Sequence, residues 1–140
     1  ETNDMIKQKL LLCEKHNLIP ILCVGETLEE RHAGLLNMVI NEQLSVINDF
    51  KSKYYIAYEP VWAIGTGETA TPETAEEVHA HIRKIVGEKT PVLYGGSVNA
   101  NNIRDLLLMA NINGALIGGA SLKATEFSEI IKISHALERV

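Results

Sequence analysis

The sequence is short of basic residues and of cysteine, and each shortage argues against a class of function. Its 140 residues include 13 lysines and arginines against 18 aspartates and glutamates, for a formal net charge of -5. The basic residues do not cluster, so we expect no nucleic-acid partner. No apolar run approaches the roughly 20 residues of a membrane-spanning helix, and we expect no signal peptide. We therefore expect a cytoplasmic protein with no membrane association.

Cysteine and histidine are too scattered for a metal centre. Cys13 and Cys23 fit neither a disulfide framework nor a zinc spacing, and we expect both to be reduced thiols in the core. None of the five histidines falls at the carboxyl end of an expected strand, because all lie in expected helices or at helix ends: His16, His32, His79, His81 and His135. The sequence therefore predicts no metal site and no cofactor.

What is present is the composition of one globular domain, with 46% hydrophobic and 22% charged residues. We expect residues 1–140 to form a single domain, since this length is about that of one core.

Four apolar runs bounded by turn residues predict strands, and helical patterns separate them. The expected strands are 18–25, 54–59, 90–96 and 114–119, and the first is expected to be buried on both faces. Helices are expected from the N-terminus to Asn17, from a capping box at Thr27 to about Ile47, and over 72–86, 101–110 and 125–139. This alternation predicts an α/β fold with a parallel sheet, either open and doubly wound or part of a (β/α)8 barrel. In both folds function lies at the carboxyl ends of the strands.

The stretch AYEPVWAIGTG (57–67) ends an apolar strand with a carboxylate. An ionised glutamate is costly at a buried strand end, so we interpret Glu59 as a general base. A structural glutamate paired with a basic residue is the alternative. A stiff Pro60, an apolar tip and two glycines follow, a pattern typical of a lid that excludes water or of an ordinary strand–helix loop.

Two glycine pairs follow the third and fourth expected strands. Gly95 and Gly96 precede Ser97, and Gly118 and Gly119 precede a turn of small residues. Glycines there let backbone N–H groups approach an anion. Because the pairs lie on neighbouring strands, we predict a phosphate site, although tight turns also use glycine.

The motifs PILCVGE, AYEPVWAIGTG, YGGSV and GALIGGASL, in this order, closely resemble those of the triosephosphate isomerase family. The resemblance covers essentially the whole chain. It implies parallel βα units forming half of a (β/α)8 TIM barrel, its last four strands. It also implies an isomerase of glycolysis and gluconeogenesis that interconverts dihydroxyacetone phosphate and glyceraldehyde 3-phosphate without a cofactor.

The resemblance further implies roles for single residues. Glu59 would move a proton between two carbons of the triose phosphate. The segment from Pro60 to about Thr66 would be the lid, with Glu26 meeting Trp62 in one lid position. Tyr94 and Ser97 would latch the closed lid, and Cys23 would be a structural core thiol. Phosphate would be held through the backbone N–H groups of Gly65, Ser97, Gly118 and Gly119.

The chain also departs from the family pattern. The family's substrate-binding Asn and Lys, and its electrophilic His, belong to the first half of its barrel and have no counterpart in this sequence. Stabilisation of the developing oxyanion is usually the largest catalytic effect, so we expect weak or no turnover from this chain alone. The family usually has Lys where Glu68 stands, and commonly two Asp residues in place of Asn111 and Asn113. One of these Asp residues usually pairs with an Arg at the position of Arg83, so we expect that ion pair to be lost.

Two alternatives stay open. One is a half-barrel that binds small phosphorylated ligands without catalysis. The other is a self-assembling half-barrel, because four parallel strands leave two open edges. A second copy of the chain or a missing N-terminal half could pair with those edges, and we expect one of these partners.

Overall fold

The computed structural model of the chain describes residues 1–64 and 70–137. Its centre is one parallel sheet in which neighbours in sequence are neighbours in space: β1 (Ile21–Val24), β2 (Tyr55–Tyr58), β3 (Val92–Tyr94) and β4 (Gly114–Ala115). The parallel βα units predicted from the sequence are confirmed. A strand order without reversal is that of a barrel segment, because a doubly wound sheet reverses its order at a switch point.

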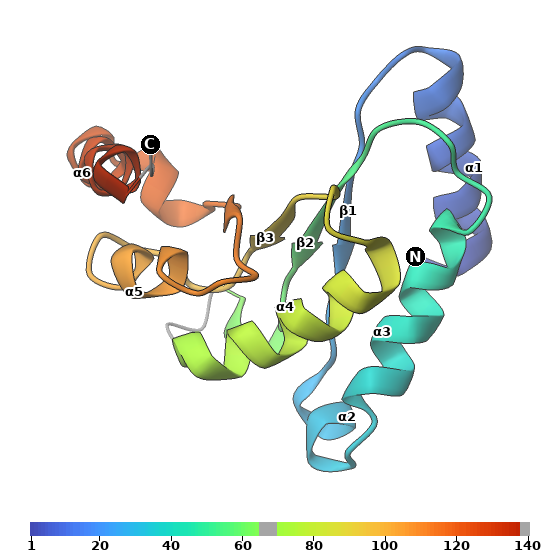
Figure 1. The fold of residues 1–140 in the computed structure, drawn as a ribbon, viewed down its shortest axis with the longest axis horizontal. Helices are drawn as coiled ribbons and strands as arrows, with labels where there is room; N and C mark the ends of the chain where they lie inside the picture. The colour runs from blue at the N-terminus through green and yellow to red at the C-terminus, as the bar shows by residue number, and fades with distance from the viewer. Residues whose placement is uncertain (65–69, 138–140) are drawn as a thin grey trace.

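Helices connect successive strands and lie around the sheet, from α1 and α3 on one side to α5 and α6 on the other (Figure 1). They are α1 (Asn3–Lys15), α2 (Leu28–His32), α3 (Leu36–Leu44), α4 (Pro72–Val86), α5 (Ile103–Leu107) and α6 (Ala124–Leu137). Short 3-10 turns cover η1 (Ser45–Ile47), η2 (Val61–Ala63) and η3 (Gly119–Leu122). Three of the helices begin where a threonine side chain accepts a backbone N–H of the first turn, at Thr2, Thr27 and Thr71.

The prediction of a single helix from Thr27 to about Ile47 is wrong, because two helices, α2 and α3, occupy this segment. Gly34 adopts a left-handed backbone with φ of 71° and separates α2 from α3. Glycine takes this conformation without the steric penalty of a side chain. The expected stop of α1 is confirmed, since Asn17, just beyond the helix, has φ of 54°.

The strand β1 is buried on one face only, which corrects the expectation that both faces would be covered. Leu22 and Val24 are buried, whereas Ile21 is 46% exposed and Cys23 is exposed. Cys13 is half-buried. Both cysteines are free thiols as expected, but neither is a core residue. The reason is that the helices of the described chain cover only the opposite face of β1.

The core lies between the sheet and its helices. Fully buried side chains of β2 and β3 pack there with residues of α3, α4 and α5, among them Ile56, Tyr58, Tyr94, Ile40, Ile82 and Leu106. Within the described ranges, β1 and β4 each pair with one neighbour and form the two sheet edges. No helix in the described part of the chain is long and apolar enough to cross a membrane.

Candidate active site

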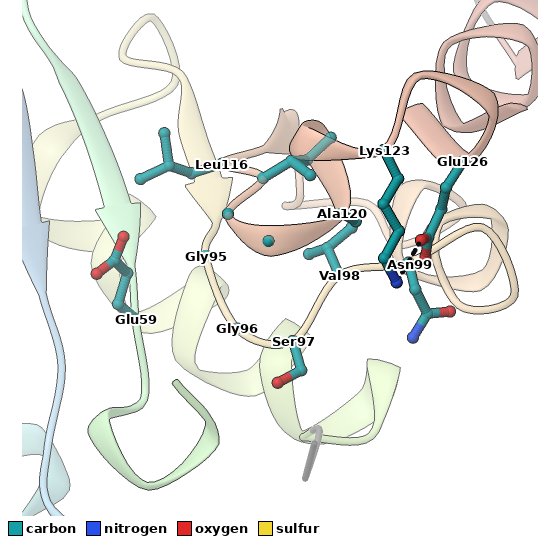
Figure 2. Close-up of a pocket in the computed structure, with 13 residues that line it drawn as sticks. Glu59, Gly95, Gly96, Ser97, Val98, Asn99, Leu116, Ala120, Lys123 and Glu126 are labelled. Carbon is teal, nitrogen blue, oxygen red and sulfur yellow. Dashed lines mark ion pairs between the residues drawn. The ribbon is translucent and has the colours of Figure 1, made fainter. Parts of the chain in front are cut away.

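A pocket of about 610 Å³ lies at the carboxyl ends of β2, β3 and β4. Residue 59 after β2, residues 95–99 after β3 and residues 116–120 after β4 line it, with Lys123 and Glu126 at the start of α6. Figure 2 shows Glu59 on one side and the Lys123–Glu126 ion pair on the other, with the turn through Ser97 between them. The parallel register brings these segments together, because carboxyl ends of neighbouring strands share one edge of the sheet.

Glu59 is half-buried and is positioned by its neighbours on both adjoining strands. On the β1 side, the Sγ of Cys23 donates to Glu59 Oε1 at 3.7 Å. Partial burial of the Sγ, and then the carboxylate itself, raise the pKa of the Cys23 thiol to about 11, so the thiol keeps its proton at neutral pH. On the β3 side, a Cβ on Gly95 would lie 2.5 Å from Glu59 Cγ. The carboxylate therefore occupies space that a side chain at residue 95 would fill.

The segment that follows Glu59 is held at its start by Glu26. This carboxylate is fully buried and accepts hydrogen bonds from Trp62 Nε1 at 3.0 Å, from Tyr58 Oη at 3.1 Å and from Arg31 Nη1 at 3.0 Å. Arg31 also supplies the positive charge that a buried carboxylate needs, and its guanidinium lies 5.4 Å from the centroid of the Trp62 ring. Burial, followed by the Glu26 charge, raises the pKa of Tyr58, which therefore stays a donor.

The end of β3 and the turn after it contact the chain near the start of the same segment and beyond its end. Ser97 Oγ donates to the carbonyl oxygen of Ala63 at 2.7 Å. The hydroxyl of Tyr94 accepts the backbone N–H of Ala70 at 3.3 Å, and Ala70 is the first residue of the second described range. Burial raises the pKa of Tyr94, so its hydroxyl stays neutral. Ser97 thus contacts the segment that the sequence predicts to be a lid, whereas Tyr94 contacts the chain beyond its predicted end at about Thr66.

A buried histidine lies behind the two tyrosines. His79 of α4 is fully buried, with its ring 5.8 Å from the Tyr58 ring and 6.3 Å from the Tyr94 ring. Its Nδ1 lies 3.3 Å from the carbonyl oxygen of Asn111, and its Nε2 has no partner among the described residues. Burial, followed by the charge of Arg83, lowers the pKa of His79 to about 4. His79 is therefore a neutral core residue at physiological pH, and it lies in a helix as the sequence predicts.

The turn after β4 has open space beside its glycines, whereas Glu59 and Tyr94 fill the space beside Gly95 and Gly96 in the turn after β3. A Cβ on Gly118 or Gly119 would meet no atom within 4 Å, and both residues are exposed. Nothing in the described protein uses this space, so the absence of side chains leaves room for a ligand. Lys123 Nζ lies 3.5 Å from Glu126 Oε2 at the same pocket and brings a positive charge to it.

The structure brings four of the predicted site residues into one pocket, namely Glu59, Ser97, Gly118 and Gly119. Pro60, Trp62, Glu26 and Tyr94 lie outside its lining. Glu26 binds Trp62 in the segment that begins at Pro60, and Tyr94 binds Ala70 beyond that segment. Gly65 lies outside the described residues, as does Glu68. Among the residues described, no group of three His, Cys, Asp or Glu side chains could hold a metal ion. The roles of the site residues stay predictions.

Contacts of four residues at or near the site, Cys23, Tyr58, Lys123 and Glu126, were not predicted from the sequence. These are the thiol of Cys23 on Glu59, the hydroxyl of Tyr58 on Glu26, and the Lys123–Glu126 pair at the pocket. The i, i+3 spacing of Lys123 and Glu126 was the only local signal for any of them. The other contacts join segments more than 30 residues apart, for which sequence spacing gives no signal.

Comparison with known proteins gives consistent matches. The family model of triosephosphate isomerase matches residues 1–134. The triosephosphate isomerase of Nitrosococcus oceani is 49% identical over 142 residues, covering 93% of this chain and 57% of the relative. The triosephosphate isomerase of Herminiimonas arsenicoxydans is 46% identical, with 94% of this chain and 58% of the relative covered. That of Mesomycoplasma hyopneumoniae strain 7448 is 48% identical, with 94% and 55% covered. The chain thus spans just over half the length of the curated relatives that it matches.

Proposed function

The chain belongs to the triosephosphate isomerase family, and from this we propose that it supplies the base, the lid contacts and the phosphate turns of a triose-phosphate isomerase. The substrates would be dihydroxyacetone phosphate and glyceraldehyde 3-phosphate, the intermediates that glycolysis and gluconeogenesis share. The observation that carries the proposal is that Glu59 lines the same pocket as the open turn at Gly118 and Gly119.

In the proposed reaction, Glu59 accepts a proton from the carbon beside the carbonyl group of the bound sugar phosphate. The resulting enediolate receives the proton back on the neighbouring carbon, so ketose and aldose interconvert with no change in composition. The Cys23 thiol donates to Oε1 of Glu59 and not to Oε2, the other oxygen of the same carboxylate. The phosphate would lie against the backbone at Ser97, Gly118 and Gly119, with the charge of Lys123 adding attraction.

The lid segment would exclude water from the enediolate, which otherwise loses phosphate. Trp62, near its start, binds Glu26 after β1, and Ala70, beyond its predicted end, binds Tyr94 of β3.

The weakest part of the proposed reaction in the isolated chain is the stabilisation of negative charge on the substrate's carbonyl oxygen. The described residues that line the pocket offer Lys123 as the one cation, and it is 75% exposed and paired with Glu126. Without a group that stabilises the developing oxyanion, turnover is slow. This observation favours a second candidate function for the chain alone, the binding of small phosphorylated ligands without catalysis.

The test is hydrogen exchange into the substrate, which detects a base even when turnover is slow. The chain is incubated with dihydroxyacetone phosphate in D2O, and deuterium incorporation is followed by NMR beside a Glu59→Gln variant. Inorganic phosphate is titrated in parallel while the amide signals of Gly118 and Gly119 are recorded. Exchange that Glu59→Gln abolishes, with shifts of both amides, supports the proposal. Amide shifts without exchange support the second candidate, and the absence of both overturns the two together.

A further inference from the structure

The side-chain amide of Gln43 binds both backbone groups of a residue in another part of the chain. Its Oε1 accepts the N–H of Gly25 at 2.8 Å, and its Nε2 donates to the carbonyl oxygen of Gly25 at 3.0 Å. Gln43 lies in α3, and this helix is anchored in the core, since Ile40 and Leu44 are fully buried. The amide therefore reaches Gly25 from a fixed position.

Gly25 lacks a strand partner for these groups because it follows the edge strand β1. The N–H of Glu59 donates to the carbonyl oxygen of Val24 at 2.8 Å, so the ladder between β1 and β2 continues past both strands. In a parallel ladder the residue after such an acceptor turns its own N–H and C=O to the opposite side. On that side of β1 no strand is paired within the described ranges. The amide of Gln43 thus takes the place of a peptide group from a neighbouring strand.

The backbone of Gly25 also lies directly against the backbone of Glu59. A Cβ on Gly25 would lie 2.6 Å from the carbonyl carbon of Glu59 and closer still to its carbonyl oxygen. The φ of Gly25 is not positive, so the missing side chain serves this close approach and not the backbone conformation. Packed groups transmit displacements to their neighbours. A movement of Gly25 is therefore passed to the backbone that carries the Glu59 side chain.

We propose that Gln43 is a positioning residue for Glu59, because its amide holds the Gly25 backbone against which the Glu59 backbone packs. This inference rests on the proposed function, in which Glu59 is the base, but the contacts themselves need no catalysis. Gln43 also lines a pocket of about 220 Å³ with Leu22 and Cys23. Water can replace a removed amide there, so the chain should still fold. Water does not fix the position of Gly25 as an amide on an anchored helix does.

The experiment compares the full chain with Gln43→Met, which keeps the length of the side chain and removes both hydrogen bonds. Amide hydrogen exchange at Gly25 and Glu59 is measured by NMR relative to Ile56, whose N–H is bonded inside the sheet at 3.1 Å. We expect exchange at both amides to speed up about tenfold relative to Ile56. The NMR signal of the Glu59 carboxyl carbon should also shift, because the side chain moves with its backbone.

Two further variants separate positioning from general damage. Glu42→Met, at the exposed neighbouring position of α3, is the matched control and should change neither the exchange ratios nor the carboxyl signal. Gln43→Asn keeps the amide but is one methylene group too short to reach Gly25. It should therefore act like Gln43→Met, which would show that reach and not polarity is what matters.

Deuterium incorporation into dihydroxyacetone phosphate tests the consequence for the base. In Gln43→Met the rate should fall at least about tenfold, while the phosphate-induced shifts of Gly118 and Gly119 persist, because their turn follows another strand. Unaltered exchange at Glu59, an unaltered carboxyl signal, or equal acceleration at Glu59 and Ile56 overturns the proposal. Deuterium incorporation equal to that of an active wild type also overturns it. If the wild type incorporates no deuterium, the proposed function fails, and the exchange and carboxyl signal of Glu59 still decide this inference.

Discussion

The side chain of Glu59 lies where a side chain on Gly95 would begin, with its Cγ 2.5 Å and its Oε1 2.8 Å from the position of a Cβ on that glycine. The two residues come from neighbouring strands and are 36 positions apart. The orientation of the proposed base therefore depends on an atom that is absent from the next strand.

The first prediction is that Gly95→Ala reorients Glu59. A displacement of a catalytic group by about 1 Å costs on the order of a hundredfold in rate, so deuterium incorporation into dihydroxyacetone phosphate should fall by about that factor. Phosphate-induced shifts at Gly118 and Gly119 should persist, because that turn is on another strand. Gly119→Ala is the matched control and should weaken phosphate binding instead. Undiminished deuterium incorporation in Gly95→Ala would show that Glu59 is not the base or is not held by this contact.

The second prediction concerns the buried carboxylate of Glu26. Glu26→Gln keeps the size of the side chain but removes the charge that binds Arg31, Tyr58 and Trp62. The free energy of unfolding should fall by about 2 kcal/mol, as measured by urea denaturation. Trp62 is the one tryptophan of the sequence, so its fluorescence should report the change directly. Glu29→Gln, an exposed position in α2, should alter neither quantity.

The third prediction concerns pH and His79. The folded-state pKa of about 4 lies below the ordinary value of 6.5, so between these pH values the unfolded chain binds more protons than the folded chain. Stability from this group is complete above about pH 6.5 and is lost as the pH falls toward 4. The difference corresponds to on the order of 3 kcal/mol.

The measurement is urea denaturation of the wild type and of His79→Gln at pH 7.5 and pH 4.5. The wild type should lose about 2.5 kcal/mol more than the variant between the two pH values. Carboxylates that titrate in this range affect both proteins alike. Equal losses would mean that His79 is accessible to protons in the folded state.

The fourth prediction compares Asn111 and Asn113, two asparagines just before β4. Arg83 is buried and donates to the carbonyl oxygens of Glu88 and Thr90, and also to Asn113 Oδ1. Asn113→Asp would put a carboxylate beside this guanidinium and raise the free energy of unfolding by about 1 kcal/mol. The gain should disappear below about pH 3, where the new carboxyl group is protonated.

Asn111→Asp should have the opposite effect. Asn111 Nδ2 donates to Glu76 Oε1 at 2.7 Å, and its backbone N–H donates to Glu76 Oε2 at 3.0 Å. A second carboxylate there would repel Glu76, so stability should fall by about 1 kcal/mol at neutral pH. Stabilisation by both substitutions would contradict this assignment of partners.

Much of the fold could be predicted from the sequence because its signals are local. Capping threonines, Asn17 and the apolar runs indicated where elements begin and end, and the four strands appeared in the expected order. The strand lengths were overestimated, most of all for β4, which covers Gly114–Ala115 rather than 114–119. After Ala115 the chain leaves the ladder for the turn that lines the pocket, and composition does not mark that departure.

The candidate site was predictable in part for the same reason. Glu59, Ser97 and the glycines stand at strand ends, and parallel strands place their carboxyl ends at one edge. The resemblance to the family also implied that the ion pair of Arg83 is lost, and in the structure Arg83 donates to carbonyl and amide oxygens.

The sequence by itself determined the order of strands and helices, the motifs at the strand ends and the family, because each depends on residues close together along the chain. Only the tertiary structure decided which face of β1 is uncovered, and which side chain each glycine accommodates. It also decided that His79, Tyr58 and Tyr94 form one buried cluster. The physical reason is that these contacts depend on strand register and on how helices pack against the sheet, and most of them join segments far apart in the sequence. Gly95 and Gly96 are adjacent and identical in sequence, yet one makes room for the proposed base and the other for the Tyr94 hydroxyl.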